Sequence, residues 1–343
     1  MLSYITKLED LSAEILMITF EYMGDIYNVF QAFFHLNQRL NDIILHPRLH
    51  TCINLTYENE QKSIYYHNVI LPIVKPLQLT IKNNTPDELI NFIFMDRLPQ
   101  RLRSFTLFNV SDDQLKSLLV SEQLPFLTDL YIHLTRLIDE TIFLYILQLP
   151  LLENCSFYFK YHAPSQIVLS LPSTIVSNIR QLRLSSLKPS CLNILLSHMP
   201  KLTWLTISVL RDMQEYLQIF SRLTHLKINV CSMPFQHLQD MLCCKELDQL
   251  KLFELSGLVR EWQFITGENW ERLMSSLSST TKLKQFKIQN LHFYSLFYVQ
   301  FAVLKLQLEV LQANDYLRQQ NFKVSYDEGS DIFMTCNFIL QRQ

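Results

Sequence analysis

The stretch "MPKLTWLTISVL", residues 199–210, has apolar side chains at positions 202, 205, 207 and 210. Gaps of three, two and three residues fit neither an uninterrupted helix nor an uninterrupted strand. Positions 205 and 207 alternate as on a short strand, where every second side chain faces the same way. We therefore predict that Leu205 and Ile207 are buried, whereas Trp204 and Thr206 face the opposite side of the strand.

The same L-x-x-L-x-L pattern recurs along the chain, with successive copies 21 to 36 residues apart. The copies begin at Leu102, Leu127, Leu152, Ile179, Leu202, Leu223, Leu247 and Leu283, with a weaker copy at Val74. Helix-like stretches separate them, and Ser111 followed by Gln114 has the spacing of a capping box. One strand and one helix cannot bury their apolar sides alone, so neighbouring copies are expected to stack.

These copies resemble the leucine-rich-repeat family over roughly residues 74–293. The resemblance implies an α/β leucine-rich-repeat solenoid, curved, with strands on the concave face and helices on the convex face. The ninth position of each copy departs from the family, because only Cys231 is of the usual type, so we expect irregular repeats. The alternative is a set of unrelated apolar strands in another kind of α/β protein.

The first fifty residues contain no such repeat. In "LSAEILMITFEYM", residues 11–23, helical spacing places Ile15, Ile18 or Thr19, and Tyr22 on one face. A second helix-like, aromatic-rich stretch follows at 26–44. The opening resembles the F-box family, although Ser12 stands where proline is usual and the later Cys-x-x-Trp signature is missing. The matching residues are Leu11, Glu14, Ile15, Leu16, Phe20 and Tyr22.

Together the two resemblances imply an F-box/leucine-rich-repeat substrate adaptor with a degenerate F-box. In that family the F-box helices bind the Skp-type subunit of a cullin–RING ubiquitin ligase, and the repeats present a protein substrate. The implied Skp-binding residues are Leu11, Glu14, Ile15, Leu16 and Phe20. Two alternatives stay open: a leucine-rich-repeat interaction scaffold whose helical head is only a cap, and an enzyme that uses the concave face.

Composition argues against several classes of partner and site. The chain has 343 residues, a net charge of −2 and four glycines, so neither a nucleic-acid or membrane partner nor a glycine-rich phosphate loop is indicated. Seven cysteines without a C-x-x-C motif predict reduced thiols and a cytoplasmic or nuclear location. His46 and His50 are four apart, but Pro47 lies between them. We predict no catalytic site, no metal site and no cofactor.

The starting residue of each copy also predicts which side chains face outward from the concave face. Third, fifth and seventh positions should face outward, and the fifth column becomes basic in its later half. Aromatic residues mixed with these cations are typical of a protein interface. We predict a groove for an acidic or phosphorylated substrate segment, the alternative being ordinary solvated lysines. The predicted substrate-binding residues are Tyr158, Arg183, Trp204, Lys227, Lys251, Phe253 and Lys287.

Four segments are expected. They are a helical F-box-like module at 1–50, a connector or N-terminal cap at 51–73, the repeats at 74–293 and a C-terminal cap at 294–343. Two β-rich runs around "DEGS" predict a hairpin in that cap.

The interval between the last two copies is the longest, and it contains residues 256–270. Trp262 and Phe264 in this segment either contact a substrate from a loop or pack against the last repeats.

Overall fold

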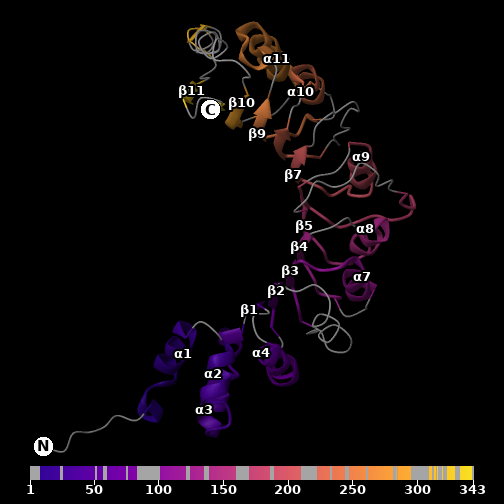
Figure 1. Ribbon diagram of the computed structural model, residues 1–343. Helices are drawn as coiled ribbons and strands as arrows, with labels where there is room; N and C mark the ends of the chain where they lie inside the picture. Colours follow the sequence, from indigo (N-terminus) through magenta and orange to yellow (C-terminus); the bar gives the residue numbers. More distant parts are fainter. Residues whose placement is uncertain are drawn as a thin grey trace, which may run out of the picture. The chain divides into compact units, whose positions relative to one another are not determined.

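The computed structural model divides into two compact units, an N-terminal unit of residues 1–152 and a C-terminal unit of residues 153–343 (Figure 1). Each unit is described by itself. The described residues are 8–23, 26–50, 52–56, 60–74, 76–82, 101–120, 124–134, 139–159, 170–185, 189–209, 222–231, 234–243, 247–259, 262–280, 283, 285–294, 309, 310, 313, 315, 319, 323–328 and 333–341.

The N-terminal unit begins with short helices: η1 (Leu8–Asp10), α1 (Ala13–Tyr22), α2 (Ile26–Phe33), α3 (Gln38–Ile44) and η2 (Pro47–His50). Asn37 caps α3, because its Oδ1 accepts a hydrogen bond from the Leu40 N–H at 2.8 Å. Buried side chains from all three α-helices form one small core; they are Leu16, Phe20, Val29, Phe30, Leu40, Ile43 and Ile44. The prediction that this segment is helical is confirmed for its described residues.

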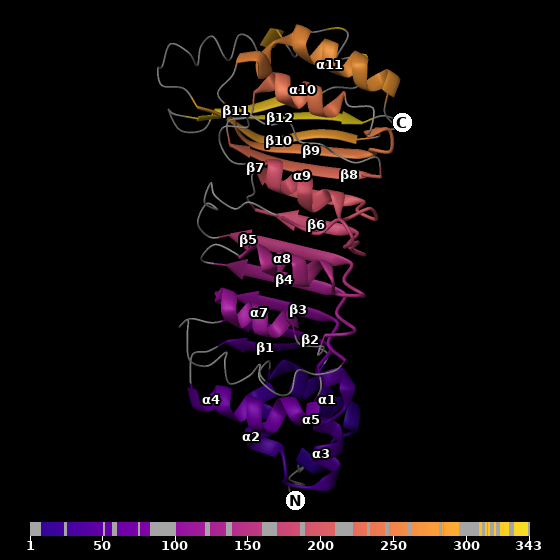
Figure 2. The ribbon, with the colours of Figure 1, turned by 90° about the vertical axis from the view of Figure 1, so that its right-hand side faces the viewer.

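Four parallel strands follow, paired in chain order: β1 (Cys52–Thr56), β2 (Gln78–Lys82), β3 (Ser104–Phe108) and β4 (Asp129–Leu134). The connections include α4 (Glu60–Tyr65), the π-helix η3 (Tyr66–Ile70), α5 (Leu71–Val74) and α7 (Asp112–Val120), and α8 (Glu140–Leu147) follows β4. Both ribbon views place α7 and α8 on the same face of β3 and β4 (Figures 1 and 2). The sequence pattern did not predict β1.

The inward positions of these strands follow the predicted alternation, with one correction. Phe105 and Leu107 of β3 are buried, as the copy beginning at Leu102 requires. Their partners on β2 are Leu79 and Ile81, which are buried too. The weak copy therefore begins at Pro76, and the frame that began at Val74 was wrong by two residues.

The predicted capping box at the start of α7 is confirmed. The Ser111 N–H donates to Gln114 Oε1 at 3.0 Å, and the Gln114 N–H donates to Ser111 Oγ at 3.4 Å. Two backbone donors that the first turn would otherwise leave unpaired are thereby satisfied. This fixes where α7 begins relative to the end of β3.

An ion pair joins α7 to the start of α8 and makes the fold sensitive to acid. Lys116 Nζ donates to Asp139 Oδ2 at 2.6 Å, and the Thr141 N–H donates to Asp139 Oδ1 at 3.0 Å. The hydrogen bond from Lys116, followed by those from Thr141, lowers the pKa of Asp139 to about 2. Because the pKa of Asp139 is lowered on folding, its carboxylate stabilises the fold at pH values above the ordinary aspartate pKa of about 3.9. This contribution is lost as the pH falls towards 2.

We therefore expect Asp139→Asn to reduce the free energy of unfolding more at about pH 6 than at about pH 3, because only the carboxylate pairs with Lys116. Urea denaturation of both proteins at the two pH values measures this. Asp315→Asn, the same change at an exposed aspartate away from Lys116, is the matched control. An equal loss at both pH values would show that the Lys116 pair contributes nothing.

The C-terminal unit contains six parallel strands in chain order: β5 (Asn154–Phe159), β6 (Gln181–Leu184), β7 (Trp204–Val209), β8 (His225–Cys231), β9 (Leu252–Val259) and β10 (Gln285–Tyr294). Its helices are α9 (Pro189–Ser197), α10 (Phe235–Leu242), the short η5 (Trp262–Ile265) and α11 (Gly267–Thr280). Leu205 and Ile207 are buried, whereas Trp204 and Thr206 are only half-buried. The prediction from the opening stretch is confirmed.

Segment 256–270 is not a single loop, since it contributes to β9, η5 and α11. Phe264 is buried against Phe235, and the Trp270 indole N–H donates to the Phe264 carbonyl at 2.7 Å. Trp270 also packs edge-on against Phe235 and Phe286. For Phe264, the alternative of packing against the last repeats is therefore correct.

The predicted C-terminal hairpin is present. β11 (Lys323–Glu328) and β12 (Phe333–Gln341) pair antiparallel, and β12 also pairs antiparallel with β10. The hairpin thus covers the backbone edge of β10, which would otherwise expose unpaired amides and carbonyls. Each unit is of the α/β class, and the four predicted segment boundaries stay a prediction.

Candidate partner-binding surfaces

Helix α1 begins at a polar cap where the F-box pattern has proline. Ser12 Oγ accepts a hydrogen bond from the Ile15 N–H at 3.4 Å. The Glu14 carboxyl accepts hydrogen bonds from its own backbone N–H and from the Ser12 side chain, and these lower its pKa, the backbone bond most strongly. Serine therefore starts the helix by hydrogen bonding, whereas proline would do so by fixing the backbone angle.

Two of the predicted Skp-binding side chains are not available to a partner. Leu16 is 0% exposed and Phe20 is 4% exposed, because both face the core of the helical module. Phe20 packs against Phe33 of α2 at 5.2 Å between ring centroids. The assignment of Leu16 and Phe20 as direct partner contacts was therefore wrong.

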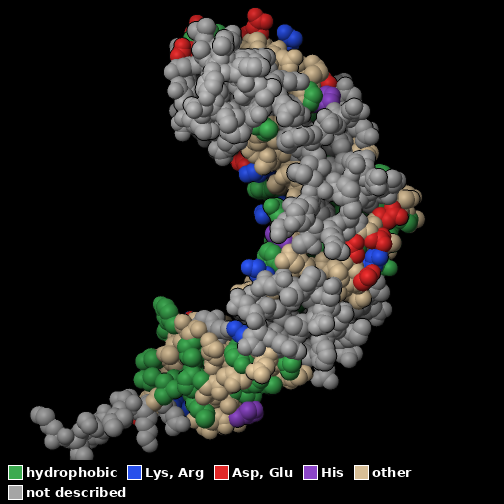
Figure 3. Space-filling view, viewed as in Figure 1, with side chains coloured by type: hydrophobic (Ala, Val, Ile, Leu, Met, Phe, Trp, Pro, Cys, Tyr) green, Lys and Arg blue, Asp and Glu red, His purple; other side chains and the backbone are tan. Residues whose placement is uncertain are grey.

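The opposite face of α1 is apolar as well, and it is exposed. Ile15, Ile18 and Tyr22 are 49%, 45% and 87% exposed, and Leu11 is half-buried. We call Leu11, Ile15, Ile18 and Tyr22 the outer stripe; the last three are aligned along α1 by spacings of three and four residues, and Leu11 lies just before the cap Ser12. Figure 3 shows hydrophobic side chains gathered over these N-terminal helices. Helical spacing had already placed Ile18 and Tyr22 beside Ile15, although neither was among the predicted binding residues.

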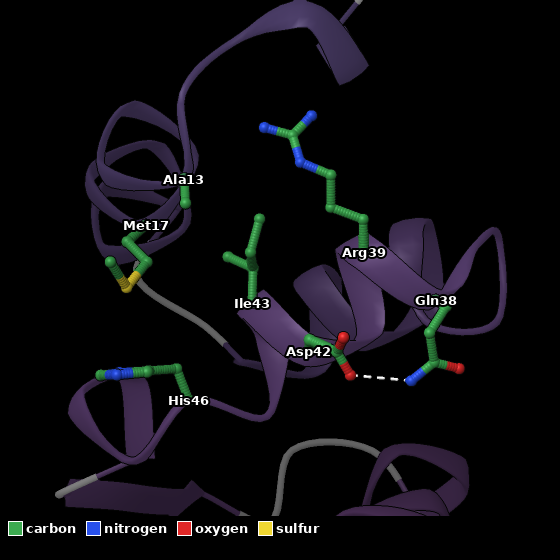
Figure 4. A pocket seen from close by; sticks show the side chains of 7 residues that line it. All are labelled: Ala13, Met17, Gln38, Arg39, Asp42, Ile43 and His46. Carbon is green, nitrogen blue, oxygen red and sulfur yellow. Dashed lines mark hydrogen bonds between the residues drawn. The ribbon is translucent and has the colours of Figure 1, made fainter.

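An open cavity of about 460 Å³ lies between α1 and α3 (Figure 4). Ala13, Met17 and Ile43 give it apolar walls, with Arg39 and His46 at its margin. The Arg39 guanidinium donates to the Leu11 carbonyl at 2.6 Å, so it also fixes the chain entering α1. Gln38 and Asp42 complete the lining, and the Gln38 amide donates to Asp42 Oδ1 at 2.7 Å, so the cavity offers both apolar and polar contacts.

The outward side chains of the C-terminal unit form a second surface. The rings of Trp204 and His225, on adjacent strands, stack at 4.4 Å with 7° between their planes. The Trp204 indole N–H donates to Thr206 Oγ1 at 3.3 Å. Burial, followed by the nearby charge of Lys251, lowers the pKa of His225. Trp204 was predicted to contact a substrate whereas its partner His225 was not, although both stand at the outward third position of consecutive copies.

The predicted frame of the β9 copy was wrong by three residues. Phe253 is 0% exposed and pairs with the inward Leu226, so it belongs to the core and cannot contact a substrate. Lys251 precedes the strand, where its N–H donates to the Thr224 carbonyl at 2.8 Å. The residue that pairs with Lys227 is Glu254. The copy therefore begins at Leu250, with Phe253 and Leu255 as its inward positions.

The predicted continuous basic column is consequently interrupted. Lys227 Nζ lies 3.0 Å from one carboxylate oxygen of Glu254, and Lys287 Nζ lies 4.0 Å from the other. Arg183 is exposed and has no ion-pair partner in the part of the chain that the structure describes. Lys251 is exposed beside His225, and Tyr158 is exposed on β5. Arg183, Trp204, Lys227 and Lys287 do lie on one face, as expected.

No reactive centre emerges from the described residues. Burial raises the pKa of the Cys155 and Cys243 thiols, which disfavours the nucleophilic thiolate. Within the described ranges, no three His, Cys, Asp or Glu side chains are placed to hold a metal ion. No helix there is long and apolar enough to cross a membrane.

No protein-family model matches the chain, and no curated protein matches it. The interpretation of its surfaces therefore depends on the residues themselves. Two surfaces stand out among the described residues: the outer stripe of α1, and the outward face of β6–β10.

Proposed function

We propose that the protein is a non-enzymatic substrate-recognition adaptor of a Skp–cullin–F-box ubiquitin ligase. Its N-terminal helices would be a degenerate F-box that binds the Skp-type subunit. Its strand–helix copies would be a leucine-rich-repeat solenoid that binds a protein substrate. The observation that carries the proposal is the exposed outer stripe of α1.

A helix that is apolar on two opposite faces needs two partners. One face of α1 is satisfied by the module's own core, through Leu16 and Phe20. The other presents Ile15, Ile18 and Tyr22 to water. Burying one such side chain contributes about 1.5–3 kcal/mol, and a helix that lays apolar anchors into a groove is a common recognition mode. Tyr22 adds an aromatic anchor of the kind enriched at binding hot spots.

The repeated part supports the second half of the proposal. Consecutive copies supply one parallel strand each, their fourth and sixth positions are buried, and an antiparallel hairpin closes the last edge. Helix α9 lies on one face of the C-terminal strands, which leaves the other face for a partner (Figure 2). An adaptor of this kind would work in the cytoplasm, the nucleus or both.

A leucine-rich-repeat scaffold without a ligase role is the second candidate. The burial of Leu16 and Phe20 favours it, since it removes two of the side chains that the F-box resemblance assigned to partner binding. In that case the helical module would only cover the start of the repeats. The two candidates differ in whether the outer stripe binds a Skp-type subunit.

We expect Ile15→Asp in the full chain to reduce recovery of a Skp-type subunit in a pull-down by at least about tenfold. A carboxylate placed in a desolvated groove costs several kcal/mol, and about 1.4 kcal/mol already corresponds to tenfold. Ile15 is half exposed in the free protein, so the fold should tolerate the change.

Two variants serve as controls for this experiment. Gln31→Asp adds the same charge on the exposed surface of α2, outside the outer stripe, and should retain the Skp-type subunit. Ile15→Leu keeps the apolar contact and should also retain it. Equal recovery with Ile15→Asp and the unchanged protein would reject the adaptor role and favour the scaffold.

A further inference from the structure

The outward face of β6–β10 has a distinct distribution of charge. Five cations occur with the single carboxylate Glu254 among its described outward and strand-entry positions; they are Arg180, Arg183, Lys227, Lys251 and Lys287. Arg180, which precedes β6, lies 3.6 Å from the Glu153 carboxylate. Glu254 lies between Lys227 and Lys287, so these three residues together carry one positive charge. Arg183 and Lys251 each add another. Figure 3 shows Lys, Arg and His side chains interspersed with apolar ones along this edge.

The spacing of the charges restricts what could bind. Arg183 on β6 and Lys227 on β8 are both in register with Thr206 of β7, so one strand separates them. Adjacent strands lie about 4.8 Å apart, which places the two backbone positions about 10 Å from each other. A single phosphate group is too small to bridge cations so far apart without both side chains bending towards it. A peptide in the polyproline II conformation advances about 3.1 Å per residue with three residues per turn, so acidic residues three positions apart face the same side and would match this spacing.

The aromatic pair lies beside the line that joins these two positive regions. Trp204 stands two residues before Thr206 on β7, and its ring is stacked on His225 of β8. Both residues are half-buried, and the stacking covers one face of each ring with the other ring. An apolar side chain between two acidic residues would therefore meet a rigid aromatic surface.

We propose that this face binds an acidic peptide segment that crosses the strands, with two carboxylates three residues apart and an apolar residue between them. This inference rests on the proposed function, because it names the substrate segment that the adaptor would recognise. Arg183 would pair with one carboxylate, and the Lys227–Glu254–Lys287 group with Lys251 would attract the other. The interaction is driven by charge, so it should weaken as salt is raised.

The test uses the full chain and two labelled peptides of identical composition, followed by fluorescence anisotropy. In one peptide two glutamates flank a Leu-Ala pair; in the other the two glutamates are adjacent. The first should bind about fivefold more tightly, the equivalent of one exposed ion pair of about 1 kcal/mol. Arg183→Glu should remove this preference. Arg272→Glu, which makes the same charge change on exposed α11, should leave it unchanged.

Several results would overturn the proposal. They are absence of binding, equal affinity for the two peptides, insensitivity to Arg183→Glu, and preferential binding of a single-stranded oligonucleotide of matched charge. Recovery of the Skp-type subunit by Arg183→Glu is measured on the same preparation and should be unchanged. Loss of peptide recognition can therefore be told apart from failure of the adaptor function, which depends on α1.

Discussion

Phe253→Ala is expected to lower the free energy of unfolding by about 3–5 kcal/mol, the usual range for a fully buried phenylalanine. The Phe253 ring is 0% exposed and stacks on Phe286 of the adjacent strand at 5.2 Å. Removing it leaves a cavity among side chains that cannot close around it. Urea denaturation followed by circular dichroism measures the loss.

Two neighbouring substitutions decide between the frames of this copy. Leu252 is only half-buried and Lys251 is exposed, so alanine at either position should cost clearly less than at Phe253. The frame beginning at Leu247 would instead make Leu252 an inward residue. A larger loss for Leu252→Ala than for Phe253→Ala would contradict the structure.

The stacked strands could be predicted because strand periodicity is strict. Once Leu202 sets the start of a copy, Leu205 and Ile207 must share a face, and they are buried. The same reasoning placed the inward residues of β3, β4, β6 and β8, where the spacing offers one solution. Local hydrogen bonding was predictable too, since the Ser111 and Gln114 capping box depends only on nearby residues.

The predicted start of a copy was wrong where the sequence contains two overlapping matches to the pattern. "LDQLKLFEL", residues 247–255, contains L-x-x-L-x-L from Leu247 and L-x-x-F-x-L from Leu250. The first match contains only leucines at its apolar positions, so it was predicted to be the strand. Packing of Phe253 against Phe286 shows that the second match is the one that forms β9. The strand β1 was missed for a similar reason, because its copy begins at His50 and has isoleucine at the fourth position.

The binding face of α1 could be predicted only in part. Its sequence is apolar on two faces, so spacing alone identifies a helix but not which face is exposed. Packing against α2 and α3 buries Leu16 and Phe20 and leaves the outer stripe exposed. The residues predicted to bind a substrate had the same difficulty, since Glu254 joins the row of cations only after the start of the β9 copy is corrected.

Gly257→Ala is the second substitution with a large expected effect. Gly257 lies in β9 with φ at 115°, a conformation that side-chain-bearing residues rarely adopt. A Cβ at this position would overlap the Val230 carbonyl oxygen of β8 and lie 2.7 Å from the Val230 nitrogen. Both atoms belong to the backbone, so no side-chain rotation relieves the contact. We expect a loss of at least about 2 kcal/mol, from backbone strain and from separation of β8 and β9.

The consequence of Gly257→Ala should extend beyond the substituted strand. Gly257 also pairs with Leu291, after the irregularity that separates Ile288 from Leu291 on β10, so displacing β9 disturbs both of its neighbours. Amide hydrogen exchange should therefore accelerate in β8, β9 and β10 together, whereas the N-terminal unit keeps its protection. Ser256→Ala, the adjacent outward position, is the matched control and should change neither the urea midpoint nor the exchange pattern. If Gly257→Ala behaved like Ser256→Ala, the close approach of β9 to Val230 would be wrong, and with it the pairing that places Glu254 beside Lys227.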